Sequence, residues 1–508
     1  MDMPASIDAT SPLIAEQSAP AKPGDSRRLF LAVFPSIMLP MFLAAVDGTI
    51  VSTALPGIAA SLGDVERISW VVVSYLVATT IAAPVYGRLG DVLGRKRLMF
   101  VALGFFILAS FLCAVAPTIL ALTAARILQG FGGGGLMTLS QALVGEVVPP
   151  RERAKYQGYM ASVFVCSSTF GPVAGGWLTQ HFGWESVFLI NLPLGLLAVG
   201  LAFRLPKRPT GSGRLNFDFV GTGLFALFIT PLLLALEQAQ RFDARLLPLI
   251  IGMVALAAVA LALLLRQESR TSSPLLPIKL LRQPTIWRSD AMAVCVGASL
   301  VSLITWLPIY LQVVRGTTAG NTGLILLPLT AFIAVGSMIT GRIIAKTGST
   351  AILPSVGLPM VSVLVVCLAL FAPYLSLSQL PWLFGAIALT QGTAMPVVQL
   401  TVQLIAGPKQ LGAAAASVQF SRSIGAAFGA AVVGTVLFGM LMATDPEAAK
   451  LFAHLVQVGP RALADIAPER LAVVQREIAE AFRAAFLTIA SFSVIGAALA
   501  WTIPMRRI

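Results

Sequence analysis

Residues 87–97 read GRLGDVLGRKR, and a worn copy of that pattern, GRIIAKTGS, occupies residues 341–349. The same separation along the chain relates a second set of glycines in the two halves: Gly158, Gly171 and Gly175 to Gly412, Gly425 and Gly429. A pattern that recurs at one separation predicts an internal repeat of one structural unit. Repeated helical units are typical of membrane transporters, although channels and scaffolds also contain them.

The composition is that of a polytopic membrane protein. Of 508 residues, 57% are hydrophobic and only 11% are charged, a balance that soluble domains do not show. Apolar runs long enough to cross ~30 Å of hydrocarbon as helices recur along the chain. We predict an all-α fold with fourteen transmembrane helices, near residues 29–56, 68–87, 98–116, 118–147, 157–179, 184–203, 218–236, 246–265, 289–313, 321–341, 350–372, 379–405, 412–442 and 482–503.

The separation of the repeats predicts a 6+2+6 arrangement of these helices. Two adjacent six-helix units would lie about 200 residues apart, and the larger separation leaves room for two inserted helices. Duplicated helical halves suit alternating access, in which two rigid bundles rock about a site at the midplane. We assign residues 1–28 to a disordered cytoplasmic tail, 29–205 to an N-terminal six-helix bundle, 206–282 to cytoplasmic linkers with the two inserted helices, and 283–508 to a C-terminal bundle that includes an outer loop at 443–481.

The distribution of basic residues predicts the orientation. The net charge is +13, and most of the 35 Lys and Arg residues fall in loops that the helices place on one side. Because basic loops stay in the cytoplasm, we expect both termini there, in a multi-pass protein of the bacterial cytoplasmic (inner) membrane. The positive charge then reports topology and contact with the lipid bilayer, and we expect no nucleic-acid partner.

The loop at residues 87–97 is a candidate conformational latch. Asp91 can pair with Arg95 or meet the positive N-terminus of a facing helix, such as the one that begins near Gly412. Either contact would hold the cytoplasmic ends of the two halves together and would have to break when the protein opens inward. The alternative is that the basic cluster only anchors topology. The candidate latch residues are Gly87, Asp91, Gly94, Arg95 and Lys96.

Asp47 and Arg126 are ionisable residues at depths where charge is costly. Asp47 is the only charged residue between Leu29 and Gly63, and Arg126 lies within the predicted helix at 118–147. A charge at that depth costs ~2.5–3.5 kcal/mol on insertion scales and is rarely kept without a partner. We interpret Arg126 as a residue that influences or senses the protonation of a nearby carboxylate, and the pair as the proton-coupling site. The alternative for Arg126 is snorkelling to the outer interface.

The stretch FGPVAGGWL at residues 170–178 predicts a kinked helix packed closely against its neighbour, because proline interrupts the helix ladder and glycine removes bulk. Packing alone, or a seal against ion leak, would explain it. The residues concerned are Gly171, Pro172, Gly175 and Gly176.

Uncharged polar, methionine and aromatic side chains predict a cavity for varied amphipathic ligands. The alternative for the glutamines is ordinary hydrogen bonding between helices. A second deep arginine, in the helix at 412–442, would pair with backbone carbonyls or with an anionic group of the substrate. The candidate cavity residues are Gln129, Gln141, Trp306, Tyr310, Gln312, Gln391, Met395, Gln399, Gln403 and Arg422.

These stretches together resemble the major facilitator superfamily, and within it the fourteen-span drug:proton antiporter group. The loop signature G-x-L-x-D-x-x-G-R-K matches residues 87–96, and a buried arginine followed by Q-G matches residues 126–130. D-x-T-I-V-x-x-A-L-P matches residues 47–56, and the glycines at 171–176 match the antiporter signature. Val92 and Ser167 depart from the pattern at the latch and at the antiporter helix. The resemblance implies multidrug efflux and, with it, antibiotic resistance.

We therefore expect a proton-coupled antiporter that exports amphipathic small molecules or drugs and uses the proton gradient, without a cofactor. Because Asp47 is the only deep carboxylate, monocations, zwitterions, neutral compounds and anions all stay open as substrates. The alternatives are a dedicated exporter of one metabolite, siderophore or lipid-like molecule, and a channel or non-transporting sensor. No nucleophile, base and orienter occur together, and the four cysteines show no metal-ligand spacing, so we expect neither an enzyme nor a metal site. Either a periplasmic adaptor assists, or the protein acts as a monomer.

Overall fold

The computed structural model describes residues 23–63, 67–206, 217–240, 243–271, 274–458 and 468–505. These residues are almost entirely helical. The helices are α2 (Pro23–Leu62), α3 (Ile68–Leu93), α4 (Arg95–Ala114), α5 (Ile119–Val147), α6 (Pro150–Phe182), α7 (Ser186–Leu189), α8 (Asn191–Ala202), α9 (Phe219–Ala239), η2 (Ala244–Leu246), α10 (Leu247–Arg270), α11 (Ile278–Leu281), α12 (Pro284–Ile309), η3 (Tyr310–Val314), α13 (Ala319–Thr347), α14 (Ile352–Phe371), α15 (Leu380–Gln391), α16 (Ala394–Ala406), α17 (Leu411–Thr444), α18 (Pro446–Val458) and α19 (Pro468–Thr502).

Twelve helices in the described part of the chain are long and apolar enough to cross a membrane. Each of the fourteen expected ranges is helical, but two of them fall outside the twelve. Helix α6 carries the charged sequence RERAK near its start, and the range 184–203 is divided into α7 and α8, which leaves the shorter apolar stretch Ser186–Ala202. An all-helical membrane fold is therefore present, whereas fourteen spans in a 6+2+6 order stay a prediction.

Several boundaries differ from those expected. Helix α2 begins earlier and ends later than 29–56, and it continues through Pro35, Pro40 and Pro56. In the outer segment 443–481, where we expect short helices, the described residues form α18 and the first turns of α19, which starts at residue 468 rather than 482; residues 459–467 lie outside the described residues. Charged and apolar residues recur in this segment with the spacing of an amphipathic helix, which favours helices there. Of the expected tail, residues 1–22 lie outside the described residues, and the remainder already belongs to α2.

Local sequence explains where individual helices start. The hydroxyl of Thr118 accepts the backbone N–H of Ala121 at the beginning of α5, and the carboxylate of Asp218 accepts that of Gly221 at the beginning of α9. Side-chain acceptors at these positions satisfy N–H groups that have no partner inside the helix. Gly348 ends α13 in the left-handed conformation, at φ 68°, which glycine adopts without strain.

The two halves touch through backbone contacts that the repeat relates. A Cβ on Gly87 of α3 would lie 2.6 Å from the carbonyl oxygen of Gly412 in α17. A Cβ on Gly158 of α6 would lie 2.9 Å from the Cα of Met338 in α13, and Gly341 of α13 meets the backbone of α6 in return. Because Gly87 and Gly341, and likewise Gly158 and Gly412, are equivalent in the repeat, equivalent glycines permit both contacts, although in the second contact each glycine meets backbone about one turn before its partner glycine. Only glycine permits this approach.

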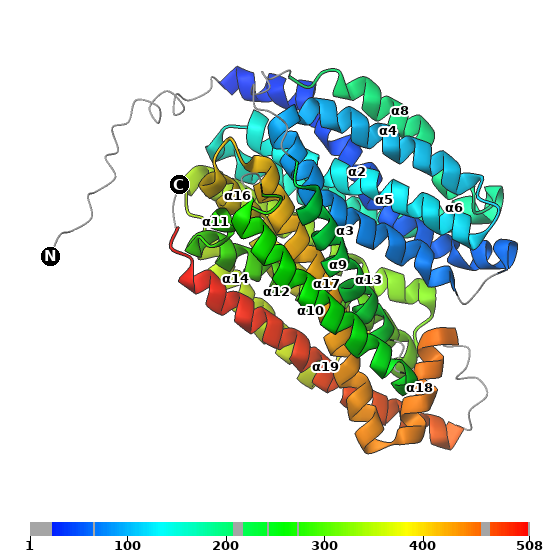
Figure 1. Ribbon diagram of the computed structural model, residues 1–508. Coiled ribbons are helices and arrows are strands. Elements are labelled where there is room, and N and C mark those ends of the chain that lie inside the picture. Colours follow the sequence, from blue (N-terminus) through cyan, green and yellow to red (C-terminus); the bar gives the residue numbers. More distant parts are fainter. Residues whose placement is uncertain are drawn as a thin grey trace.

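Helices α9 and α10, which the expected 6+2+6 order treats as inserted, lie beside helices of both halves. Helix α9 packs against α3 and α17 as well as against α10. Phe225 and Ile229 of α9 join Val85 of α3 in a buried apolar cluster, against which Phe420 of α17 also packs. Figure 1 shows the first turns of α2 and the last turns of α19 at one end of the molecule and α18 at the other. The end with these chain termini also carries the Gly87–Gly412 contact, which we expect to face the cytoplasm.

Candidate functional site

Asp47 lies in a closed polar cluster inside the first half. Its side chain is 0% exposed, and it accepts hydrogen bonds from Arg126 Nη1 at 2.5 Å, Gln129 Nε2 at 2.8 Å and Asn191 Nδ2 at 2.9 Å. These donors come from α5 and α8, and the acceptor from α2. Charge-assisted hydrogen bonds of this kind are the strong ones. The structure thus brings together Asp47 and Arg126, the two deep charges that the sequence singled out in this half.

The guanidinium of Arg126 is held on several sides. Its Nε donates to the carbonyl of Val71 at 3.1 Å, and its Cζ lies 4.1 Å from the ring centre of Tyr75. Tyr75 is fixed in turn, because its hydroxyl donates to the carbonyl of Ala44 at 2.9 Å. Backbone, cation–π and ion-pair contacts together compensate the loss of water around this buried cation. Snorkelling to the interface, the alternative interpretation of Arg126, is not what the structure shows.

The run of four glycines after Arg126 makes room for these contacts. A Cβ on Gly133 would overlap the Tyr75 hydroxyl, and one on Gly134 would lie 2.5 Å from the carbonyl oxygen of Thr79. On the other side of α5, a Cβ on Gly132 would lie 2.7 Å from the backbone of Phe106 in α4. Helices α3 and α4 therefore approach the backbone of α5 closely, which brings the Tyr75 ring over the guanidinium.

A second set of hydrogen bonds connects the donors to one another. Ser110 Oγ accepts from Gln129 Nε2 at 2.8 Å and from Asn191 Nδ2 at 3.3 Å, and it donates to the carbonyl of Phe106 at 2.7 Å. Gln129 Oε1 accepts from Arg126 Nη1 at 2.7 Å. Protonation at Oδ2 would remove the charge of Asp47 and place a hydrogen where Arg126 now donates, whereas Oδ1 could still accept from both amides. Proton binding at Asp47 would therefore rearrange the cluster.

The glycine face of α6 packs against the residues that follow Asp47. A Cβ on Gly175 would lie 2.5 Å from the carbonyl oxygen of Ile50, and one on Gly171 would overlap the hydroxyl of Thr49. That hydroxyl donates to the carbonyl of Ser167 at 3.1 Å. Pro172 is half-buried within the helix, and a Cβ on Gly176 would meet no described atom within 4 Å. Close packing of α6 against its neighbour, as expected for this stretch, is present.

The segment 87–97, expected to be a loop, is helical except at Gly94, where α3 gives way to α4, and it contacts the second half. Asp91 Oδ1 and Oδ2 accept the backbone N–H groups of Gly412 at 2.9 Å and Ala413 at 3.1 Å. Arg95 forms ion pairs with Asp91 and with Glu146 of α5. Both contacts that the sequence offered as alternatives for Asp91, with Arg95 and with the start of α17, occur together. A carboxylate at a helix N-terminus is favoured by the helix dipole as well as by the hydrogen bonds.

Two further latch residues, Gly94 and Lys96, stabilise the segment 87–97 itself. Gly94 has φ 93°, a conformation that other residues adopt only with strain, and it separates α3 from α4. Lys96 Nζ donates to the carbonyls of Phe203 and Leu205 at 2.7 and 2.5 Å, just after α8. Through these hydrogen bonds Lys96 joins the segment 87–97 to the residues that follow α8 at the end of the first half.

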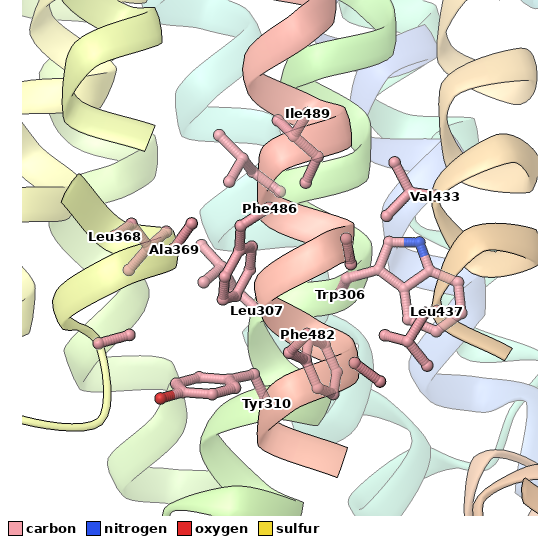
Figure 2. Packing of buried hydrophobic residues seen from close by; sticks show 14 of the residues in the cluster. Trp306, Leu307, Tyr310, Leu368, Ala369, Val433, Leu437, Phe482, Phe486 and Ile489 are labelled. Carbon is pink, nitrogen blue, oxygen red and sulfur yellow. The ribbon is translucent and has the colours of Figure 1, made fainter. Parts of the chain in front are cut away.

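Trp306 and Tyr310 do not line a ligand cavity in this structure, contrary to expectation. They are 2% and 1% exposed and belong to a large apolar cluster of the second half. Figure 2 shows them among side chains of α14, α17 and α19, including Phe482 and Phe486. The Tyr310 ring lies 5.4 Å from each of these two phenylalanine rings. Edge-to-face packing explains the position of Tyr310, and the indole Nε1 of Trp306 donates to the carbonyl of Ala430 in α17 at 3.2 Å.

Gln391, Met395, Gln399 and Gln403 are spaced four residues apart in one candidate membrane span, Leu380–Ala406, whose backbone stays helical through the two residues that separate α15 from α16. Gln391 Nε2 donates to the carbonyl of Val296 in α12 at 3.3 Å, which is hydrogen bonding between helices of one half. Gln399 is 5% exposed, and its amide nitrogen has no hydrogen-bond partner among the described residues. Met395 is half-buried beside it. For Gln391 the alternative interpretation, interhelical hydrogen bonding, fits the structure better.

Two further cavity candidates meet at the boundary between the halves. Gln403 Nε2 of α16 donates to the backbone carbonyl of Gln141 in α5 at 3.0 Å. A Cβ on Gly145 would lie 2.9 Å from Gln403 Oε1, so the glutamine is held against the backbone of α5. Gln403 thus helps to close the molecule at this end. Gln312 is half-buried in the π-helical turn η3, away from this contact.

Arg422 lies at the same boundary but farther along α17. Its Nη2 donates to Gln419 Oε1 at 3.1 Å, and its Cζ lies 4.7 Å from the ring centre of Phe164 in α6. The guanidinium is half-buried. The structure therefore keeps Arg422 among the candidate ligand contacts and adds Phe164 from the other half.

The sequence interpretation missed four residues that the site uses: Ser110, Tyr75, Asn191 and Glu146. Asn191 stands in FLINLPLG, residues 188–195, as a single amide in an apolar stretch. An amide within a membrane helix indicates a hydrogen-bond partner nearby, since an unpaired amide is costly there. Glu146 lies at the end of α5, and nothing in its spacing indicated a partner on the loop at 87–97.

The comparisons with known proteins agree on one family. The family model described as Major Facilitator Superfamily matches residues 37–430. A protein of Mycobacterium tuberculosis described as an uncharacterized MFS-type transporter is 32% identical over 479 residues, which cover 92% of this chain and 68% of that protein. The multidrug transporter protein MdtP of Bacillus subtilis is 32% identical over 403 residues, which cover 79% of this chain and 74% of that protein.

Solved structures also match over nearly the whole chain. The crystal structure of the human organic anion transporter MFSD10 (TETRAN) aligns with a TM-score of 0.64 at 15% identity, and it covers 92% of this chain and 99% of that one. At such an identity the likeness concerns the fold alone.

Proposed function

The chain belongs to the major facilitator superfamily, and from this premise we propose that it is a proton-coupled antiporter that exports amphipathic small molecules across the cytoplasmic membrane. It is a membrane transporter and not an enzyme. Its relatives include a multidrug transporter, which supports efflux as the direction of transport and drugs as the substrate class. We place it in the fourteen-span drug:proton antiporter group, with a 6+2+6 order and both termini in the cytoplasm.

The observation that carries proton coupling is the completely buried carboxylate of Asp47. A carboxylate that accepts three hydrogen bonds, one of them from an arginine, can exist in two states that differ in charge and in hydrogen bonding. Proton uptake at Oδ2 would release Arg126 from Asp47, while the two amides could stay bonded to Oδ1. Since the same stretch of α2 packs on α6, such a rearrangement has a direct path to a helix that also contacts the second half through α13.

The contacts between the halves supply the conformational element. The ends of α3 and α17, and those of α6 and α13, are in backbone contact, and Asp91 caps α17. This arrangement corresponds to a state closed at the cytoplasmic end. Alternating access then requires the Asp91 and Gln403 contacts to separate while the two halves move as bundles. Efflux would follow from coupling that opening to the protonation of Asp47.

Proteoliposomes with an imposed pH gradient test the proposal. The purified protein is expected to move a fluorescent amphipathic substrate against its concentration gradient only while the pH gradient lasts. Asp47→Asn keeps the size and polarity of the side chain but cannot carry the charge, and it is expected to abolish gradient-driven accumulation. Asp290→Asn is the matched control: Asp290 is also a buried aspartate, but it lies in α12 outside the cluster. Undiminished coupled transport by Asp47→Asn would refute the assignment of Asp47.

A thermal-shift screen and the proteoliposome assay together separate the remaining alternatives. A dedicated exporter of one metabolite, siderophore or lipid-like molecule would respond to a narrow set of compounds in a thermal-shift screen. A channel would give an ohmic flux that does not saturate, and a non-transporting sensor would give none. Saturable flux coupled to the gradient excludes both.

A further inference from the structure

Arg422 is a deep cation for which the protein supplies no counter-ion among the described residues. It lies in α17, and the carbonyl oxygen of the same residue is 2.5 Å from where a Cβ on Gly297 of α12 would lie. Within the described ranges no ion pair includes Arg422. Its polar partner is the neutral amide of Gln419. Arg126, the other deep arginine, forms an ion pair with Asp47, which neutralises its charge. A deep charge without a counter-ion is expensive in a membrane and is a mark of function.

Asp290 of α12 is a buried carboxylate beside α17, but it contacts a different face of that helix. Its Oδ1 lies 3.4 Å from the hydroxyl of Ser417. Because Ser417 and Arg422 are five positions apart in one helix, their side chains point about 140° apart around its axis. Asp290 of α12 therefore approaches the face of α17 that carries Ser417, whereas Arg422 points toward Phe164 of the opposite half.

The contact with Phe164 places the guanidinium where the two halves meet. Phe164 belongs to α6, and its ring centre is 4.7 Å from Arg422 Cζ. Neither side chain is fully buried, so the N–H groups that do not bond Gln419 can reach a ligand. A guanidinium offers five donors in a planar fork that fits a carboxylate or sulfonate, while an aromatic ring beside it offers an apolar surface. Arg422 is thus a positive charge without a counter-ion among the described residues, placed where the two halves meet.

We propose that Arg422 is the anion-binding residue of the substrate site and that the transported molecules are amphipathic organic anions, with a carboxylate or sulfonate on an apolar, aromatic-sized body. The inference rests on the proposed function, because it names the substrate class of that transporter. Gln419 and Phe164 act with Arg422: the amide orients the guanidinium, and the ring packs against its face. An anionic substrate does not compete with protons at Asp47, so coupling would run through helix movement rather than through a shared residue.

Binding at equilibrium, without any pH gradient, tests this assignment. The protein is placed in nanodiscs of neutral phosphatidylcholine, and 1-naphthaleneacetate and 1-naphthaleneacetamide, which share a shape but differ in charge, are titrated by calorimetry. A charge-assisted bidentate contact predicts that the carboxylate binds about ten- to a hundredfold more tightly than the amide. Arg422→Gln is expected to remove the difference and to leave the affinity for the amide within about twofold. Equal affinities in the unaltered protein, or a preference that persists in Arg422→Gln, would overturn the proposal.

Two variants guard against unfolding and nonspecific charge effects. Arg288→Gln also removes a half-buried arginine that stacks on an aromatic ring, 5.3 Å from the centre of Trp287, but near the start of α12, and the preference is expected to survive. Arg422→Lys keeps the charge without the planar fork and should retain part of the preference; complete loss with intact folding would contradict a charge-based site.

A further titration shows whether Arg422 binds a soluble anion or a lipid headgroup. The titration is repeated in nanodiscs that contain phosphatidylglycerol. An unchanged preference for the carboxylate supports a soluble substrate, whereas its disappearance would assign Arg422 to lipid phosphate and refute the proposal. Because no proton gradient is present, failure here leaves the Asp47 experiment unaffected, and failure of that experiment leaves this one interpretable.

Discussion

The Asp91 carboxylate lies 2.9 Å from the backbone nitrogen of Gly412, so that a side chain of the first half caps a helix of the second. The repeat-related contact between α6 and α13 has no such carboxylate, because Ala345 occupies the position equivalent to Asp91. The backbone approach is therefore symmetric while the charged contact is not. We infer that the closed state is held mainly on the α3–α17 side, where breaking one cap would loosen the boundary.

Replacing Asp91 with Asn should shift the protein toward an inward-open state. The change removes the charge at the N-terminus of α17 and one ion-pair partner of Arg95. Loss of a charge-assisted hydrogen bond is worth ~1.5–3 kcal/mol, which corresponds to about ten- to a hundredfold in the ratio of open to closed molecules. Spin labels at the exposed positions Arg97 and Lys409 would report the separation by electron double resonance.

Asp243→Asn, in an exposed segment before η2, provides the control for loss of one negative charge. Its distance distribution should match that of the unaltered protein. If Asp91→Asn also left the distribution unchanged, Asp91 would not hold the halves together.

Two adjacent glycines of α6 should differ sharply in their tolerance of a methyl group. Gly175→Ala places a Cβ 2.5 Å from the carbonyl oxygen of Ile50, whereas Gly176→Ala meets no described atom within 4 Å. Overpacking against a backbone typically costs ~1–3 kcal/mol. We expect Gly175→Ala to lower the melting temperature in detergent by a few degrees and to impair transport, and Gly176→Ala to do neither. Equal effects of both substitutions would show that α6 packs on α2 less tightly than these distances imply.

Sequence patterns predicted the helices and the contacts of Asp47 and Asp91 because each depends on a charge in an apolar or glycine-rich setting. A buried charge has few possible partners, so Arg126 was a natural one for Asp47. Trp306 and Tyr310 were misassigned because spacing along α12 does not reveal which distant helix lies beside it. Phe482 and Phe486, from the far end of the chain, cover them. Asn191 was missed because its partner, Asp47, lies 144 residues earlier in the chain, and no spacing connects the two.

Arg126→Gln should be strongly destabilising, and a second substitution at Asp47 should rescue it. The single change leaves the Asp47 carboxylate buried with two amide donors but no cation, and breaking one partner of a buried ion pair typically costs ~3–5 kcal/mol. Asp47→Asn combined with Arg126→Gln removes the stranded charge, so the double variant is expected to unfold at a higher temperature than Arg126→Gln alone. Thermal unfolding of the four proteins in one detergent closes the double-mutant cycle. Strictly additive losses of stability would mean that the two side chains do not interact energetically, and the 2.5 Å contact between Arg126 Nη1 and Asp47 Oδ2 would then not stabilise the fold.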